Sequence, residues 1–321
     1  MRVPDGVVVG VATHTGLSRS VNEDDYVVVA LAEDLPDPSQ VAGEPVVDGS
    51  LQGCTLFAAV ADGMGGVAGG AEASRAGLRG FAAGFLRASV AEAGAPDREA
   101  MMRNGFASAC ERVVEQAELV PALRDMGTTL TVLALYPDSV VMGHIGDTRA
   151  YRLRDGLLER LSTDHASEEH SHWLLRCVGG GQPAEEPDVL RFDARPGDRF
   201  LLCSDGVWGT VALENLVGML ASEPPDIVAE ELVDRANRAG GPDNATALVL
   251  ELGEPRGESG KEVVLPAEES SRLLEVAGRR QRLGGPLWPW LLMLFGVLLI
   301  AISVLQWFLG FDLFTWVAGL F

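Results

Sequence analysis

The chain has 321 residues, 47% of them hydrophobic, which is enough to bury the core of one large domain or two modest ones. Its 25 basic and 46 acidic residues give a formal net charge of −21, opposite in sign to a nucleic-acid-binding surface, so we expect no nucleic-acid partner. The same charge disfavours attachment to an anionic membrane by electrostatics alone, and the high apolar content excludes a disordered chain.

Strands and paired helices follow one another in blocks along the first 250 or so residues. Apolar and β-branched runs predict strands, and apolar residues at helical spacing predict helices. In chain order we expect strands at 7–14, 25–32 and 55–62, helices at 71–90 and 97–119, strands at 128–136, 139–147, 149–156 and 200–206, helices at 212–222 and 225–240, and a closing strand at 244–252. Helices that arrive in pairs favour an α+β fold, with helices outside antiparallel sheets, over a doubly wound parallel fold.

The C-terminal part of the chain differs in composition. Residues 254–285 are rich in Glu, Gly, Arg and Ser, which predicts a linker. The 21 uncharged residues 289–309 would cover about 30 Å as a helix, the thickness of one hydrocarbon core. A buried core helix is the alternative, but it would be shorter and interrupted by polar positions. We therefore expect these parts: a folded domain at 1–253, the linker at 254–285, a transmembrane helix at 286–309 and a short tail at 310–321.

The residues around the predicted transmembrane helix indicate its orientation. Arg279, Arg280 and Arg282 precede it and Asp312 follows it, and positive charge favours the cytoplasmic side. The four cysteines form no CxxC pair, which favours reduced thiols of a cytosolic domain over a disulfide framework or a zinc site. We therefore expect a single-pass protein of the cell membrane with its folded domain in the cytoplasm.

Acidic residues recur at the ends of the predicted apolar strands. Asp62, Asp147 and Asp205 each end a strand, Asp243 precedes the last strand, and Glu23-Asp24 precedes another. One such residue is typical of a turn. Several of them, brought together, would repel one another strongly unless divalent cations held them, and oxygen ligands select Mg²⁺ or Mn²⁺. If the strand ends converge, the sequence predicts a polynuclear metal site.

A glycine-rich segment after the third predicted strand offers a competing interpretation. Residues 63–68 fit the G-x-G-x-x-A pattern of dinucleotide-binding proteins. However, Asp62 would place a negative charge beside the pyrophosphate, and the acidic residue expected about 20 positions later is missing. We therefore favour glycines that let the backbone approach a metal, with the Gly63 carbonyl as a ligand.

Several short motifs occur in a characteristic order. They are Arg19-Ser-Val-Asn-Glu23-Asp24, Ala61-Asp62-Gly63-Met64-Gly65-Gly66, Gly127-Thr128-Thr129, Ile145-Gly146-Asp147-Thr148-Arg149, Asp164-His165, Cys203-Ser204-Asp205-Gly206 and Gly240-Gly241-Pro242-Asp243-Asn244. Together they make residues 7–252 resemble the metal-dependent Ser/Thr protein phosphatases of the PPM family (type 2C) in its bacterial form.

This resemblance implies a four-layer αββα sandwich of two antiparallel sheets flanked by helix pairs. It also implies two Mn²⁺ or Mg²⁺ ions and, in bacterial members, a third, weaker one. The implied roles are Asp62 as the bridge between two ions, Asp205 and Asp243 as further ligands of the first, Glu23 and the Gly63 carbonyl as ligands of the second, Asp147 with Asp205 as the third site, and Arg19 as the phosphate-binding residue.

The resemblance further implies a reaction and its partners. A hydroxide that bridges two cations attacks the phosphorus of phosphoserine or phosphothreonine, while the metals and Arg19 offset the developing charge. The substrates would be phosphorylated Ser/Thr proteins, and an opposing Ser/Thr protein kinase would be a partner. The alternative is a membrane-tethered pseudophosphatase that binds phosphoproteins without turnover, which the retained carboxylates disfavour.

Three positions depart from the family pattern. Val67 stands where many bacterial relatives have a histidine, so a metal-bound water, His165 or a group of the substrate must protonate the leaving oxygen. The segment from His165 to Trp173 is short where the family usually inserts a longer flap, which affects substrate selection. Gly209 replaces a common aspartate and is expected to remove only a local hydrogen bond.

Overall fold

The computed structural model describes residues 6–30, 54, 56–91, 97–167, 174–181 and 186–253, all within one compact unit. Its strands are β1 (Val7–His14), β2 (Asp24–Ala30), β3 (Leu56–Met64), β4 (Gly127–Thr128), β5 (Leu130–Leu135), β6 (Ser139–Ile145), β7 (Arg149–Arg154), β8 (Leu157–Arg160), β9 (Val178–Gly179), β10 (Asp188–Asp193), β11 (Arg199–Cys203) and β12 (Ala245–Leu252). Its helices are α1 (Gly66–Ala91), α2 (Arg98–Leu119), a 3-10 turn (Pro121–Leu123), α3 (Asp205–Trp208), α4 (Leu213–Ser222) and α5 (Pro225–Arg238).

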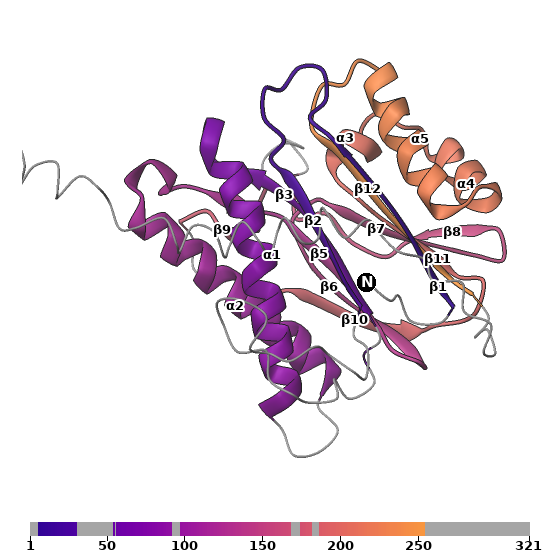
Figure 1. Ribbon diagram of the computed structural model, residues 1–321, viewed down its shortest axis with the longest axis horizontal. Coiled ribbons are helices and arrows are strands. Elements are labelled where there is room, and N and C mark those ends of the chain that lie inside the picture. The colour runs from indigo at the N-terminus through magenta and orange to yellow at the C-terminus, as the bar shows by residue number, and fades with distance from the viewer. Residues whose placement is uncertain are drawn as a thin grey trace, which may run out of the picture. The chain divides into compact units, whose positions relative to one another are not determined.

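Within these residues the strands form two antiparallel sheets, each covered on its outer face by helices (Figure 1). The five-stranded sheet has the order β1-β12-β11-β7-β8. The seven-stranded sheet has the order β10-β6-β5-β3-β4-β9, with β2 also paired to β3. Helices α1 and α2 pack on the seven-stranded sheet, and α4 and α5 pack on the five-stranded one. The expected α+β sandwich of two antiparallel sheets between helix pairs is therefore confirmed.

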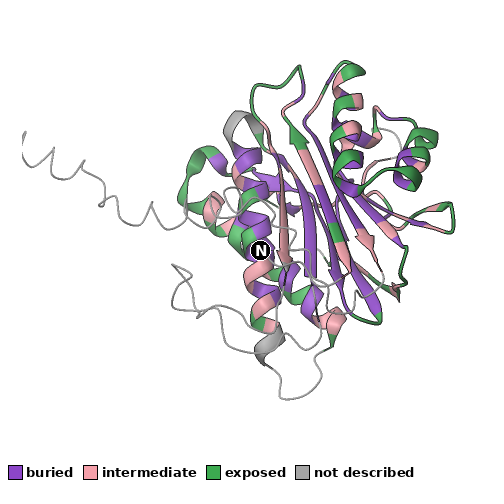
Figure 2. Cartoon of the chain, turned by 45° about the vertical axis from the view of Figure 1, so that its right-hand side comes forward, coloured by how far each residue is buried: buried purple, intermediate pink, exposed green. Residues whose placement is uncertain are grey.

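Strand β3 shows how the layers are held together. Successive side chains of a strand point to opposite faces of the sheet. Phe57 accordingly packs beneath α1, with its ring 5.7 Å from that of Phe81, while its neighbour Ala58 lies in the apolar layer between the sheets with Phe200. Both faces of β3 are thus buried, as the purple central strands of Figure 2 show. This explains why the strand is a continuous apolar run in the sequence.

The observed strand ends differ from the predicted ones near the acidic residues. β3 continues two residues beyond Asp62, which therefore lies inside the strand rather than at its end. β11 ends at Cys203, and Asp205 begins the single-turn helix α3. The predicted strand at 128–136 is divided at Thr129. The sequence did not predict β8, β9, β10 or α3.

The C-terminal predictions lie outside the described residues. These are the linker at 254–285, the transmembrane helix at 286–309 and the tail at 310–321, and with them the domain boundary at 253 stays a prediction. Among the residues that the structure describes, no helix is both long enough and apolar enough to cross a membrane.

Candidate active site

One pocket of about 670 Å³ brings all the predicted site residues together. It lies where strands of both sheets end, and its walls include Arg19, Glu23, Asp62, Gly63, Asp147, Asp205 and Asp243. The pocket also contains residues to which the sequence assigned no role. Among these are Asp125, Thr129, Leu174, the largely exposed Leu175 and Asn244.

The backbone of Asp62 is held by the two threonines of the Gly-Thr-Thr motif. The Asp62 N–H donates to Thr129 Oγ1 at 2.9 Å, and the Thr129 N–H donates back to the Asp62 carbonyl at 2.9 Å. The hydroxyl of Thr128 donates to the same carbonyl at 2.9 Å. These bonds occupy the backbone of Asp62 and leave its carboxylate directed to the pocket. The motif therefore positions an acidic side chain.

Asn244 plays a comparable part for Glu23. Its Oδ1 accepts from the Glu23 N–H at 2.8 Å, and its Nδ2 donates to the carbonyls of Thr15 at 2.7 Å and Val21 at 3.0 Å. The side chain is buried, so each of these bonds is shielded from water. Asn244 thus fastens the loop between β1 and β2, which carries Arg19 and Glu23, to the start of β12.

Arg19 reaches across the pocket to an acidic residue. Its Nη2 donates to Asp243 Oδ2 at 2.7 Å, and about half of its side chain is exposed. The hydrogen bond to Asp243 raises the pKa of Arg19 above its ordinary value. The planar guanidinium can hold two oxygens of a carboxylate or a phosphate at once, so this position suits the capture of an anion.

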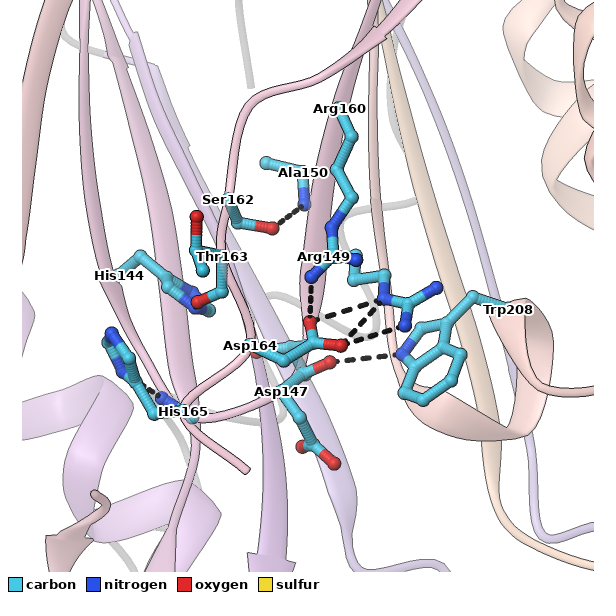
Figure 3. Close-up of polar contacts among 12 residues, drawn as sticks. His144, Asp147, Arg149, Ala150, Arg160, Ser162, Thr163, Asp164, His165 and Trp208 are labelled. Carbon is cyan, nitrogen blue, oxygen red and sulfur yellow. Dashed lines mark hydrogen bonds and ion pairs between the residues drawn. The ribbon is translucent and has the colours of Figure 1, made fainter. Parts of the chain in front are cut away.

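Trp208 connects the segment of Asp147 with the short helix that begins at Asp205. Figure 3 shows its contact with Asp147. Trp208 lies on α3, which begins at Asp205, and its Nε1 donates to the Asp147 carbonyl at 3.0 Å. The Arg149 guanidinium lies 3.4 Å from the centre of the Trp208 ring and binds Asp164 with an Nη2–Oδ2 distance of 2.7 Å. These contacts hold together the segment of Asp147 and Arg149, the segment of Asp164 and the helix α3.

Burial and mutual repulsion change the acidity of these carboxyl groups. Burial raises the pKa of Asp62 well above its ordinary range, and the nearby charges of Asp24 and Asp205 raise it further. Burial likewise raises the pKa of Asp147 to about 7 and that of Asp24 to about 7. Such groups favour a proton or a bound cation over a bare negative charge.

The donor set of the pocket fits hard divalent cations. Every predicted ligand offers an oxygen atom, the donor that Mg²⁺ and Mn²⁺ prefer. Glu23 Oε1 and Asp24 Oδ1 are buried without a hydrogen-bond partner among the described residues, although the backbone of Gly70 faces the Glu23 carboxyl. Within this described part of the chain, no three acidic, histidine or cysteine side chains form a ready-made metal cage.

The glycines after Asp62 are explained by close backbone contacts. A Cβ atom on Gly63 would lie 2.0 Å from the carbonyl oxygen of Gly70 in α1, and one on Gly70 would lie 2.4 Å from Glu23 Oε1. Any side chain at either position would push α1 away from β3. The structure thus gives these glycines a packing role between β3 and α1, whereas the expectation that they let the backbone approach a metal stays a prediction.

His165 does not line the pocket. It is buried, its Nδ1 accepts from the Gly146 N–H at 3.1 Å, and its Nε2 lies 3.1 Å from Asp188 Oδ2. Both ring nitrogens are thus engaged in holding neighbouring segments. Among the three proton donors considered for the leaving oxygen, this geometry disfavours His165.

Comparison with known proteins agrees with the motifs and the fold. The serine/threonine protein phosphatase PstP of Mycobacterium tuberculosis is 34% identical in an alignment of 229 residues that covers 64% of this chain and 42% of PstP. This chain thus spans less than half the length of that relative. The serine/threonine phosphatase stp of Listeria welshimeri is 29% identical over 210 residues, 60% of this chain and 82% of the relative.

Solved structures and a family model complete the comparison. The catalytic domain of PstP in complex with two manganese ions superposes with a TM-score of 0.60 and 29% identity, over 77% of this chain and 99% of that one. The family model of protein phosphatase 2C matches residues 46–248, more than half of the chain. The chain belongs to the protein phosphatase 2C family.

Proposed function

We propose that this protein is a metal-dependent protein serine/threonine phosphatase that hydrolyses phosphoserine and phosphothreonine on proteins. The observation that carries the proposal is the convergence of Arg19 and the acidic motif residues on one pocket. The reaction class is supported by the names of the PstP and stp relatives, and the metal by the manganese ions of the PstP structure.

The proposed metal ligands are the family's motif positions. When bound, Mn²⁺ or Mg²⁺ lowers the pKa of a coordinated water toward neutrality and offsets the charge of the phosphate. We assign the ligands as follows: Asp62 to both ions of a pair, Asp205 and Asp243 to the first, Glu23 and the Gly63 carbonyl to the second, and Asp147 with Asp205 to a third and weaker site.

The remaining residues of the pocket orient the substrate. Arg19 holds two oxygens of the phosphate, so that the phosphorus faces the acidic floor. The wall that includes Leu174 and Leu175 contacts the peptide around the phosphorylated residue. Because His165 lies outside the pocket, water or a group of the substrate supplies the proton to the departing serine or threonine oxygen.

We also propose that the enzyme is anchored in the cell membrane by residues 286–309, with the phosphatase domain in the cytoplasm. The support is the uncharged 289–309 segment and the arginines that precede it. Cytoplasmic proteins phosphorylated by an opposing Ser/Thr protein kinase would then be the substrates.

Phosphate release from phosphoserine and phosphothreonine peptides tests the reaction. We expect the full-length protein to turn over these peptides with added Mn²⁺ or Mg²⁺ and to stop when EDTA is added. Turnover that ignores the chelator would contradict the metal assignment. Phosphopeptide binding without phosphate release would instead favour the pseudophosphatase alternative.

A further inference from the structure

Asp125 is an acidic residue of the pocket that belongs to none of the motifs. It is exposed and lines the same pocket as Arg19. Its carboxylate forms no hydrogen bond or ion pair with any residue that the structure describes, and the adjacent Arg124, also exposed, forms no ion pair with it. The carboxylate is therefore available to a ligand that enters the pocket.

The backbone next to Asp125 is firmly held. The Met126 N–H donates to the Leu123 carbonyl at 3.0 Å, and the Met126 carbonyl accepts from the Gly180 N–H at 2.8 Å. A Cβ atom on Gly65 would lie 2.8 Å from the Met126 Cα, so the chain after β3 packs directly against this segment. The Met126 side chain is buried. An exposed carboxylate on such a fixed segment binds a ligand at a smaller ordering cost than one on a flexible loop.

The surroundings of the carboxylate leave room for a ligand. Gly180 and Gly181 form a turn with φ values of 68° and 67°, a conformation that favours glycine. A Cβ atom on Gly181 would meet, among the described atoms beyond its own neighbours, only Asp125 Oδ1, at 4.0 Å. On this side the carboxylate therefore borders backbone without side chains, where a long side chain of a ligand can approach it.

The charge of Asp125 has no assigned counterpart in the proposed reaction. The proposed metal ligands are other residues, and Arg19 is assigned to the phosphate. The net charge of −21 favours basic over acidic substrates at long range, but it selects no particular position in a peptide. A single carboxylate at the wall of the pocket makes such a selection, because an ion pair forms only with a cation that reaches it.

We propose that Asp125 is a specificity-determining residue that binds an arginine or lysine near the phosphorylated residue of the substrate. This inference rests on the proposed function, because it concerns the peptide that the phosphatase hydrolyses. The preferred substrate class is therefore basic phosphopeptides. A glutamate at the same position of the peptide is disfavoured by repulsion.

A series of phosphothreonine peptides tests the proposal. One arginine is placed in turn at each position around the phosphothreonine, and a peptide with alanine at these positions is the reference. With saturating Mn²⁺, we expect the full-length wild type to favour the best arginine peptide by about three- to fivefold in kcat/KM, the strength of an exposed ion pair. Asp125→Asn should lose most of this preference, whereas Asp125→Glu, which keeps the charge, should retain it.

Asp155→Asn is the matched control, since it changes the net charge of the protein by the same amount. Asp155 is exposed in the turn between β7 and β8, outside the pocket, and its φ of 51° is one that asparagine adopts readily. This variant should keep the wild-type preference. An unchanged preference in Asp125→Asn, or an equal fall in kcat/KM for the arginine and alanine peptides, would overturn the proposal.

Peptide binding without turnover gives a second readout. In the analogue peptides a methylene group replaces the ester oxygen of phosphothreonine, so no hydrolysis occurs. We expect fluorescence anisotropy to give the arginine analogue a Kd about three- to fivefold below that of the alanine analogue, with most of the difference lost in Asp125→Asn. Equal affinities in the wild type would also overturn the proposal. Failure of the proposed function is distinguishable, since the wild type would then release phosphate from none of the peptides.

Discussion

Asp147 should make the metal-free protein less stable as the pH rises. Its side chain is 8% exposed, and burial, with repulsion from Asp205 and Asp164, raises its pKa from 3.8 to about 7. The folded state therefore keeps a proton that the unfolded chain has already lost, so stability is highest below about pH 4 and falls until about pH 7. At about 1.36 kcal/mol per pKa unit, the charge costs at most about 4 kcal/mol. Relaxation of the neighbouring charges reduces this to about 2 kcal/mol.

The substitution Asp147→Asn removes the charge and keeps the size of the side chain. In urea unfolding with EDTA, we expect the variant to gain about 2 kcal/mol relative to the wild type between about pH 5 and about pH 8. Glu111→Gln, an exposed change on α2, should show no such trend. Saturating Mn²⁺ near pH 8 should stabilise the wild type more than the variant. A variant whose relative stability does not change with pH, or falls, would refute the reasoning.

Three further changes test the assigned roles. Asp62→Asn should abolish most Mn²⁺-dependent phosphate release without unfolding the domain, because one carboxylate serves both proposed ions; near wild-type rates in the folded variant would contradict this. Arg19→Ala should raise the KM for a phosphopeptide by a factor that corresponds to about 1.5–3 kcal/mol, with partial recovery in Arg19→Lys, and unchanged saturation kinetics would remove Arg19 from the phosphate site. Truncation after Leu252 should move active enzyme from the membrane pellet to the supernatant, and a full-length chain found in the soluble fraction would refute the span at 286–309.

The sequence predicted buried strands better than edge strands. β3, β5 and β6 are buried on both faces, so each forms an apolar run that is visible without the structure. β8 and β10 lie at the edges of their sheets and carry charged side chains, such as Glu159 and Arg191, which interrupt the apolar signal. The single turn of α3 is too short to show any helical period.

The sequence was enough to predict which residue types form the site. It was less informative about the hydrogen bonds that position them and about the other residues that line the pocket. The order of the motifs was enough to predict five of the acidic residues that share the pocket, Glu23, Asp62, Asp147, Asp205 and Asp243, but not Asp125. The hydrogen bonds of Asn244 were not predictable, because their partners Thr15 and Val21 are more than 220 positions away in the sequence. Asp125 and Leu175 belong to no motif and reach the pocket only through tertiary packing.

Three acidic residues of the pocket are positioned through their backbones by neutral side chains. The pairs are Asp62 with Thr128 and Thr129, Glu23 with Asn244, and Asp147 with Trp208. A neutral donor or acceptor fixes the main chain without neutralising the carboxylate, whereas a buried cationic side chain would compete with a metal ion for the same oxygens.

Arg19 is the exception, and its exposure explains why it is tolerated. It binds Asp243 at 2.7 Å from the solvent side, where an ion pair contributes little and exchanges readily. In the proposed reaction, a cation that binds Asp243 takes over the neutralisation of that carboxylate. In that proposal the guanidinium is then free to hold the phosphate, so the proposed metal binding and the proposed phosphate capture would be coupled through one carboxylate.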